Sequence, residues 1–130
     1  TVDPRSMNRT PLAGFRIVLI EDDHDVLVAT AALLKGWGCL VQDFDTMPDT
    51  VELADLILTD FDLGSGITGT RCIAHIRSIT GTETPAIIMT GHDEARVRSL
   101  IELPRVQLMT KPLRPSALRS LLSSVRIGAF

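Results

Sequence analysis

Acidic side chains follow two largely apolar runs of the sequence. The run Leu56–Thr59 ends in Asp60, and the run Arg16–Ile20 ends in Glu21 and Asp22. Apolar runs of this length are typical of strands covered on both faces, as in a parallel α/β sheet. Open sheets of this kind bind ligands at the carboxyl ends of their strands. Because crowded carboxylates repel one another unless a cation neutralises them, the acids indicate a site for Mg²⁺, which prefers oxygen ligands.

Local structural roles are the alternative explanation of these acids. Asp60 alone would also suit the end of a strand before a turn, since several glycines follow it. Asp23 or Asp25 is expected to cap the helix that follows the first strand. Capping uses one carboxylate, however, whereas four of the five residues from Glu21 to Asp25 are acidic. Capping therefore explains one member of the group and leaves the others for ligand binding.

Two later strands also end in residues able to take part in chemistry. Pro85–Met89 is followed by Thr90, and Val106–Thr110 is followed by Lys111. Parallel strands bring these ends to the same edge of the sheet as the acids. A carboxylate there can act as a nucleophile and form an acyl phosphate, while a metal, a hydroxyl and an ammonium contact the transferred oxygens. Asp60 is the expected nucleophile, because it stands alone at the end of the central strand.

The remaining elements must position these strand ends. A weaker strand at Cys39–Phe44 is expected near an edge of the sheet. The expected helices are Asp25–Lys35, a short one within Thr46–Leu53, Thr70–Ser78, one capped by Asp93 and ending near Glu102, and Ser116–Arg126. The apolar residues expected on their inner faces are Val26, Ala29, Leu33 and Trp37; Ile73, Ile76 and Ile79; Val97, Leu100 and Ile101; and Leu118, Leu121, Leu122 and Val125. This alternation predicts an α/β fold, a doubly wound five-stranded parallel sheet of the (βα)5 type.

Length and composition fit one globular domain. The 130 residues are 45% hydrophobic and 22% charged, which is ordinary for a soluble protein. The net charge of −3 and the 4% aromatic content argue against nucleic-acid binding. No apolar stretch approaches the roughly 18 residues that span a bilayer, so no membrane contact is expected. Cys39 and Cys72 lack metal-ligand spacing and are expected to be reduced thiols of a cytoplasmic protein.

The ends of the chain are expected to lie outside the domain. Residues 1–14 carry no periodicity and are interpreted as a flexible lead-in, with Thr1–Ser6 a candidate cloning remnant. The domain is expected over residues 15–126, and residues 127–130 form a C-terminal tail.

The order of these strand ends resembles the response-regulator receiver domains of two-component signalling. The resemblance rests on the acid pair after the first strand, an Asp after the third, Thr90-Gly91 after the fourth and Lys111-Pro112 after the fifth. It covers about Phe15 to Val125 and implies a flavodoxin-like receiver fold. A receiver accepts a phosphoryl group from a histidine kinase or a phosphotransfer domain and is itself no turnover enzyme.

The resemblance assigns roles by position. It implies that Asp60 is the phosphoacceptor, that Thr90 and Lys111 contact the phosphoryl group, and that the Lys111–Pro112 peptide bond is cis. The implied Mg²⁺ ligands are Glu21, Asp22, Asp60 and the backbone carbonyl of Asp62. The positions implied to tune the reaction or the switch are Asp62, His92 and Leu108. Leu108 departs from the family, which often has Tyr or Phe there, so the usual coupling of the threonine to an aromatic ring is in doubt.

The sequence also suggests a subtype and a docking surface. Trp37-Gly38-Cys39, Met89–His92 and Lys111–Pro115 resemble the C-terminal receivers of hybrid sensor histidine kinases. A separate short regulator and a receiver cut from a longer chain both fit. Residues 96–130 hold seven basic and one acidic side chain, against six and fifteen in residues 1–95. The arginines expected on the face of the last two helices, as solvated surface or a docking site for an acidic partner, are Arg96, Arg98, Arg105, Arg114 and Arg119.

Two functions of other classes remain open. Asp60-Phe61-Asp62 resembles the Asp-x-Asp motif of aspartate-nucleophile phosphatases, although that motif usually follows the first strand and is covered by a cap segment. A receiver-like interaction module that is never phosphorylated is the other alternative. Leu108 is compatible with such a module, whereas the complete set of acids, threonine and lysine favours phosphoryl acceptance.

Overall fold

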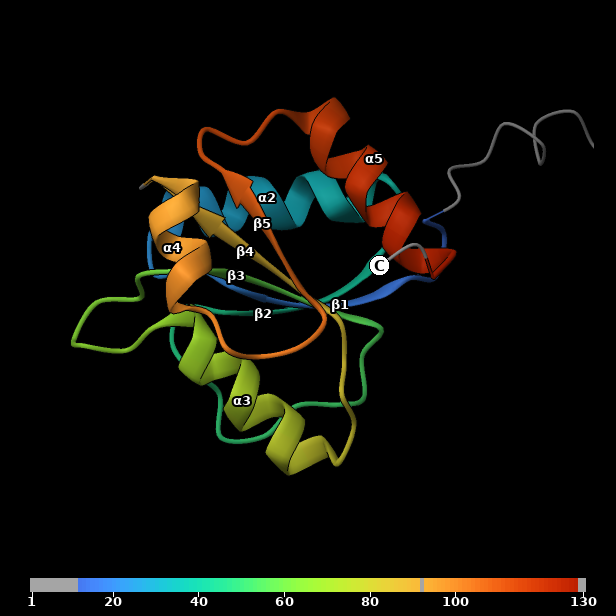
Figure 1. The fold of residues 1–130 in the computed structure, drawn as a ribbon. Coiled ribbons are helices and arrows are strands. Elements are labelled where there is room, and N and C mark those ends of the chain that lie inside the picture. Colours follow the sequence, from blue (N-terminus) through green and yellow to red (C-terminus); the bar gives the residue numbers. More distant parts are fainter. Residues whose placement is uncertain (1–11, 92, 129–130) are drawn as a thin grey trace, which may run out of the picture.

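Five parallel strands form a single sheet in the computed structural model, which describes residues 12–91 and 93–128. The strands are β1 (Arg16–Ile20), β2 (Leu40–Phe44), β3 (Leu56–Asp60), β4 (Ala86–Thr90) and β5 (Val106–Thr110). Their order in the sheet is β2-β1-β3-β4-β5, so β3 is the central strand (Figure 1). Every residue of β3 and β4 is buried, as the unbroken apolar runs predict. The predicted α/β fold with five parallel strands is confirmed.

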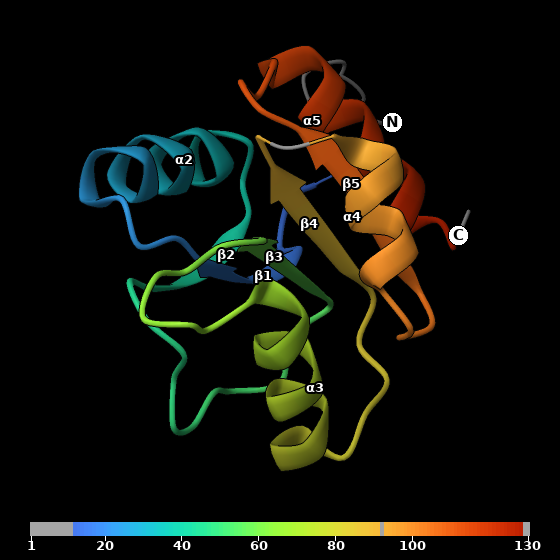
Figure 2. The same ribbon diagram turned by 60° about the vertical axis from the view of Figure 1, so that its left-hand side comes forward.

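Helices cover both faces of this sheet. The described helices are α2 (His24–Gly36), α3 (Gly69–Thr80), α4 (Glu94–Leu100) and α5 (Pro115–Arg126). The helices α2 and α5 pack on one face through a core that includes Leu34 and Leu118, and α3 packs on the other through Ile73 and Ile76 (Figures 1 and 2). Residues alternate between the two cores along each strand, which fixes the sheet between the helical layers.

The helix expected between β2 and β3 is absent, and the prediction for Thr46–Leu53 was wrong. An extended loop joins the two strands instead. The Gln42 side chain holds it by accepting from the Glu52 amide at 2.9 Å and donating to the Glu52 carbonyl at 3.1 Å. Met47 and Val51 pack against the core that α3 covers. The segment thus partly buries apolar side chains as a helix would, but its proline and β-branched residues disfavour helical geometry.

The inner faces of the helices were predicted with mixed success. In α2 the buried stripe is Leu27, Thr30, Ala31 and Leu34. Of the predicted inner face, Ala29 is exposed, so its prediction was wrong, whereas Leu33 and Trp37 are partly buried against the core. This helix is apolar on nearly every side, and periodicity therefore could not select the face. In the other helices the predicted inner residues Ile79 and Leu100 are 43% and 59% exposed, because α3 and α4 end beside them. Those confirmed as buried are Ile73, Ile76, Val97, Leu118, Leu122 and Val125.

The chain is packed from Leu12 onward. Leu12 is fully buried, and the Gly14 amide donates to the Gly38 carbonyl at 2.8 Å. Cys39 and Cys72 are both free and buried. Burial raises the pKa of the Cys72 thiol to about 11, which keeps it protonated and unreactive. Within the described ranges no helix combines the length and the apolar character that a bilayer crossing requires.

Candidate functional site

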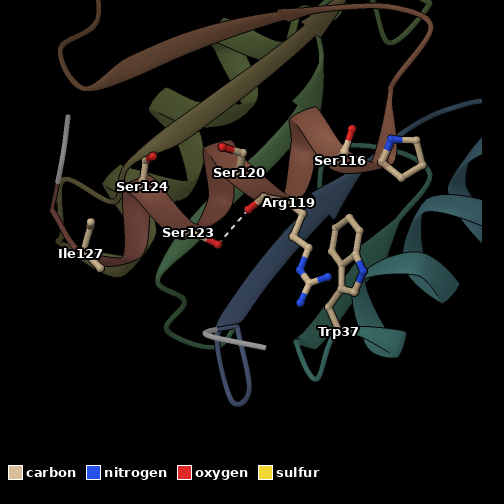
Figure 3. A pocket seen from close by; sticks show the side chains of 8 residues that line it. Trp37, Ser116, Arg119, Ser120, Ser123, Ser124 and Ile127 are labelled. Carbon is tan, nitrogen blue, oxygen red and sulfur yellow. Dashed lines mark hydrogen bonds between the residues drawn. The ribbon is translucent and has the colours of Figure 1, made fainter. Parts of the chain in front are cut away.

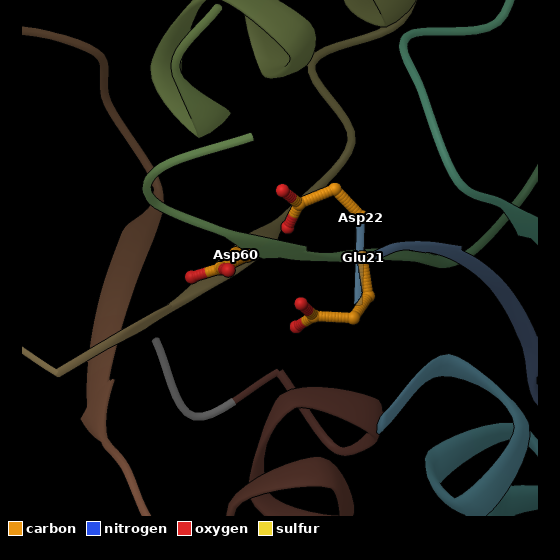
Figure 4. A group of neighbouring side chains, drawn as sticks. All are labelled: Glu21, Asp22 and Asp60. Atoms are coloured by element: carbon orange, nitrogen blue, oxygen red, sulfur yellow. The ribbon is translucent and has the colours of Figure 1, made fainter. Parts of the chain in front are cut away.

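Three carboxylates meet at the carboxyl edge of the sheet. Since Ile20 of β1 lies opposite Thr59 of β3, the residues that follow these positions are neighbours. One ligand oxygen from each of Glu21, Asp22 and Asp60 lies within 4.8 Å of the others (Figure 4). The Glu21 side chain is 1% exposed and Asp60 is buried, while Asp22 is exposed on the solvent side. A set of hard oxygen donors with one side open fits a Mg²⁺ ion that keeps part of its water shell.

Lys111, which follows the edge strand β5, contacts two of these acids. Its Nζ lies 3.1 Å from Glu21 Oε2 and 3.1 Å from Asp60 Oδ2. The strand order puts β4 between β5 and β3, so the long side chain crosses the end of β4 to reach them. The Lys111 amide donates to the Thr90 carbonyl at 2.8 Å, and the Lys111–Pro112 bond is cis, as predicted. The positive charge of Lys111 therefore stabilises two buried carboxylates at once.

Electrostatics in the site follow from this crowding. Burial, and next the charge of Asp60, raise the pKa of Glu21, which the hydrogen bond from Lys111 only partly offsets. Burial alone would lower the pKa of Lys111, but its hydrogen bonds to Asp60 and Glu21 prevail and raise it. The ammonium is thus kept charged, and the carboxylates retain an excess of negative charge that a second cation would relieve.

Asp23 has a structural role. It is the N-cap of α2, and its Oδ1 accepts from the Asp25 and Val26 amides at 3.1 and 3.2 Å. The Asp23 amide in turn donates to Glu21 Oε1 at 3.2 Å. One acid of the group therefore caps the helix, as predicted, and this leaves Glu21 and Asp22 at the site.

The other predicted residues lie around this centre. Thr90 is fully buried at the end of β4, one position beyond the residue opposite Asp60. Asp62 is exposed; its Oδ1 accepts from the Gly64 amide at 3.1 Å, and it forms an isolated antiparallel bridge with Thr68. Leu108 is half-buried against the core under α3. His92 lies outside the described residues.

Gly69 was not recognised from the sequence as part of the site. It begins α3, and its amide donates to the Phe61 carbonyl at 2.7 Å. A Cβ built on Gly69 would lie 2.3 Å from the Asp60 carbonyl oxygen and 3.0 Å from Thr59 Cγ2. Real Cβ atoms do not approach backbone atoms so closely. The absence of a side chain at position 69 therefore allows α3 to press directly on the peptide unit that carries Asp60.

The five arginines expected on one face are separated in the structure. Arg98 and Arg105 line a hollow beside β5. Arg119 lies over the Trp37 ring, 6.0 Å from its centroid, on the side of α5 that faces α2. Arg96 and Arg114 line two further hollows. The basic C-terminal part of the chain thus presents several small surfaces.

Replacing Lys111 by methionine is expected to lower the free energy of unfolding by about 2 kcal/mol. The change leaves Glu21 and Asp60 buried without a counter-charge, and the partial exposure of the lysine keeps the loss below the roughly 3–5 kcal/mol of fully buried pairs. Lys35, the only other lysine, is exposed, and Lys35→Met is the matched control, with an expected effect within about 0.5 kcal/mol. Urea unfolding without divalent cations measures both. Equal stabilities of the two variants would contradict the charge-neutralising role of Lys111.

Comparisons with known proteins agree with this geometry. The sequence model of the response regulator receiver domain matches residues 17–123. Among solved structures, the chain is similar to a response regulator receiver protein from Sinorhizobium medicae WSM419, with 20% identity, coverage of 90% of this chain and 98% of the other, and a TM-score of 0.75. A receiver domain protein from Clostridium thermocellum is 20% identical, with coverage of 85% of this chain and 93% of the other and a TM-score of 0.72. The BeF3-activated DrrB receiver domain is 23% identical, with coverage of 88% of this chain and 98% of the other and a TM-score of 0.74. No curated protein matches the chain.

The two kinds of similarity carry different weight. At such low identity the solved structures establish the fold alone. The family model covers most of the sequence, including the ends of β1, β3, β4 and β5. The chain belongs to the response regulator receiver domain family of two-component signalling.

Proposed function

We propose that Asp60 accepts a phosphoryl group from a phosphohistidine of a histidine kinase or phosphotransfer domain, with Mg²⁺ held by Glu21, Asp22 and Asp60. The observation that carries the proposal is the position of Lys111. Its ammonium lies 3.1 Å from Asp60 Oδ2, while three carboxylate oxygens lie within 4.8 Å of one another beside it. This arrangement offers a nucleophile flanked by a fixed positive charge and by a group of metal ligands.

The reaction would be a displacement at phosphorus. An Asp60 carboxylate oxygen attacks the phosphorus, the bond to the histidine nitrogen breaks, and its electron pair returns to the imidazole of the donor. A bound Mg²⁺ would supply positive charge to the transferred oxygens, with the Asp62 backbone carbonyl as a further ligand. Lys111 would exchange its Asp60 contact for one with the new phosphoryl oxygens. Thr90, at the end of the neighbouring strand, would donate a hydrogen bond from its hydroxyl group to another phosphoryl oxygen.

The modification would change the charge of the site. A phosphoryl group adds about 1.5–2 negative charges beside the buried Glu21. Lys111 and Thr90 follow these charges, and the chain between Thr90 and α4 moves with Thr90. Other receivers often have an aromatic side chain at the position of Leu108, and its ring follows the movement of the threonine. Leu108 has no ring, so a different side chain must transmit the movement. Asp62 and His92 are the proposed positions that set the lifetime of the acyl phosphate.

The phosphatase alternative is weaker. Asp60 follows the third strand of the chain, and the described residues contain no segment placed as a cap over it. Repeated hydrolysis of a small phosphate ester would favour that alternative, whereas a receiver takes up one phosphoryl group and keeps it for a time. We further propose that the domain acts in the cytoplasm and that it is of the type found at the C-terminus of hybrid histidine kinases.

Mass spectrometry after treatment with acetyl phosphate and Mg²⁺ tests the proposal. We expect one acid-labile phosphoryl group per chain, located on the peptide that contains Asp60. Absence of labelling would leave the interaction module as the better description, and labelling on another residue would contradict Asp60 as the acceptor.

Alanine at Asp22 is expected to abolish Mg²⁺-dependent labelling while the protein stays folded. Asp22 is exposed and lies at the open side of the site, so its removal takes away a metal ligand without a large cost in packing. Labelling measured over a Mg²⁺ titration checks this prediction. Asp49→Ala, at an exposed position far along the chain, is the control. A normal Mg²⁺ titration in Asp22→Ala would exclude Asp22 as a ligand.

A further inference from the structure

A groove without any carboxylate lies between α5 and the end of α2. It has a volume of about 730 Å³, and its lining includes Trp37, Arg119, Ser120 and Ile127 (Figure 3). The adjoining stretches 26–42 and 103–130 contain no Asp or Glu at all, although the whole chain carries a net charge of −3. The residues that line the groove therefore contribute the positive charge of Arg119 and no negative charge.

Arg119 supplies the charge inside the groove. Its guanidinium carbon lies over the Trp37 ring at 6.0 Å from the centroid, a contact that favours this orientation of the group. Among residues 12–91 and 93–128, no acceptor is bonded to its N–H donors. An oriented guanidinium whose edge is open to solvent suits a carboxylate, which can accept two parallel hydrogen bonds from it.

The floor of the groove is low because serines line it. Ser116, Ser120, Ser123 and Ser124 lie along the outer side of α5, and their small side chains leave the helix accessible (Figure 3). Larger apolar groups rise at the two ends, with Trp37 half-buried and Ile127 80% exposed. Between Ser116 and Ile127 the helix rises about 16 Å, which is the length of a helical partner segment of about 11 residues.

We infer that this groove docks an acidic, amphipathic segment of a partner protein. A carboxylate of the segment pairs with Arg119, its neighbours meet the serine hydroxyls, and an apolar side chain covers Trp37 or Ile127. Residues 1–11 of this chain do not have the required chemistry, because they contain two arginines and a single aspartate. Arg98 does not share the groove; it pairs with Glu94 at 2.8 Å and lines a separate hollow.

The docking site is separate from the phosphorylation site. Among residues 12–91 and 93–128, no hydrogen bond or ion pair joins Arg119 or Trp37 to Glu21, Asp60 or Lys111, and binding at the groove requires no phosphoryl transfer. Arg119→Glu is therefore expected to leave the labelling of Asp60 unchanged. This separates a failure of the docking inference from a failure of the proposed function.

The test is fluorescence anisotropy with a labelled peptide of about 11 residues that presents Glu and Leu on one helical face. We expect the unaltered protein to bind it, and a peptide with Lys in place of Glu to show no binding. Arg119→Glu should weaken binding at least about tenfold, because it replaces attraction by repulsion at the centre of the site. Ser120→Phe fills the floor of the groove without changing its charge and should weaken peptide binding to a similar extent. Arg98→Glu is the matched charge control and should leave peptide binding unchanged.

Three results would overturn the inference. The first is no binding of the acidic peptide by the unaltered protein. The second is equal weakening by Arg98→Glu and Arg119→Glu, which would mean that net charge alone attracts the peptide. The third is concentration-dependent self-association of the protein in sedimentation experiments that Arg119→Glu removes, which would assign the groove to a second copy of this chain through its own acids.

Discussion

Replacing Asp60 by asparagine is expected to abolish phosphoryl labelling altogether. The amide has nearly the same size as the carboxylate but offers no anionic oxygen to attack phosphorus and ligates Mg²⁺ poorly. The fold should persist, since Lys111 keeps its contact with Glu21 at 3.1 Å and one of the three crowded carboxylates loses its negative charge. Mass spectrometry after acetyl phosphate treatment measures the label, and circular dichroism confirms that the variant is folded.

Asp62→Asn is the matched control for this change. Asp62 lies only two residues after Asp60 and is exposed, so a reagent could reach its carboxylate as well. We expect Asp62→Asn to be labelled on Asp60, with a changed lifetime of the acyl phosphate. If Asp60→Asn still gained a label and Asp62→Asn did not, the acceptor would be Asp62, and the function would need to be rebuilt around the Asp-x-Asp motif.

The sequence predicted which strand ends meet better than it predicted the layers around the sheet. The buried strands β3 and β4 are continuous apolar runs, so the residues that end them could be placed at one edge without knowledge of any helix. That reasoning brought Glu21, Asp60 and Lys111 together, and the structure places Lys111 Nζ 3.1 Å from each of the two carboxylates. The same reasoning did not predict that Lys111 contacts both carboxylates. Whether its side chain can reach across β4 depends on the twist of the sheet and not on sequence order.

The helices were harder to predict because their signals are weaker. In α2 apolar residues occur on nearly all sides, and the buried face is shifted by one residue from the predicted one. Between β2 and β3, burial of Met47 and Val51 was achieved by a loop that two hydrogen bonds from Gln42 hold in place. Side-chain to backbone contacts of this kind have no sequence period, so a pattern based on helical spacing cannot detect them.

The close contact between Gly69 and the backbone of Asp60 has a signal in the sequence, namely a glycine that the turn does not require. Three glycines at 64, 66 and 69 were interpreted together as a turn after Asp60. Gly64 and Gly66 do have positive φ angles of 73° and 77°, as turn glycines do. Gly69 has no such φ and is the first residue of α3. A glycine that neither a turn nor a helix requires indicates close approach of two backbone segments.

Alanine at Gly69 is accordingly expected to destabilise the protein by at least about 3 kcal/mol, at the upper end of overpacking costs. The new Cβ would meet the Asp60 carbonyl oxygen at 2.3 Å, and that oxygen also accepts from Thr59 Oγ1 at 3.0 Å. Relief therefore requires movement of α3 or of the peptide unit that carries Asp60. Urea unfolding followed by Trp37 fluorescence measures the change in stability, and the labelling rate of the folded variant should fall as well, because Asp60 shifts away from Lys111.

Gly36→Ala is the control with the opposite expected sign. Gly36 is the last residue of α2, and a Cβ built there meets no atom within 4 Å. Alanine should stabilise the protein by up to about 0.5–1 kcal/mol, because it lowers the entropy of the unfolded chain and favours the helix. A loss below about 1 kcal/mol in Gly69→Ala, with normal labelling, would mean that the Asp60 backbone yields without cost and that α3 does not hold the acceptor in place.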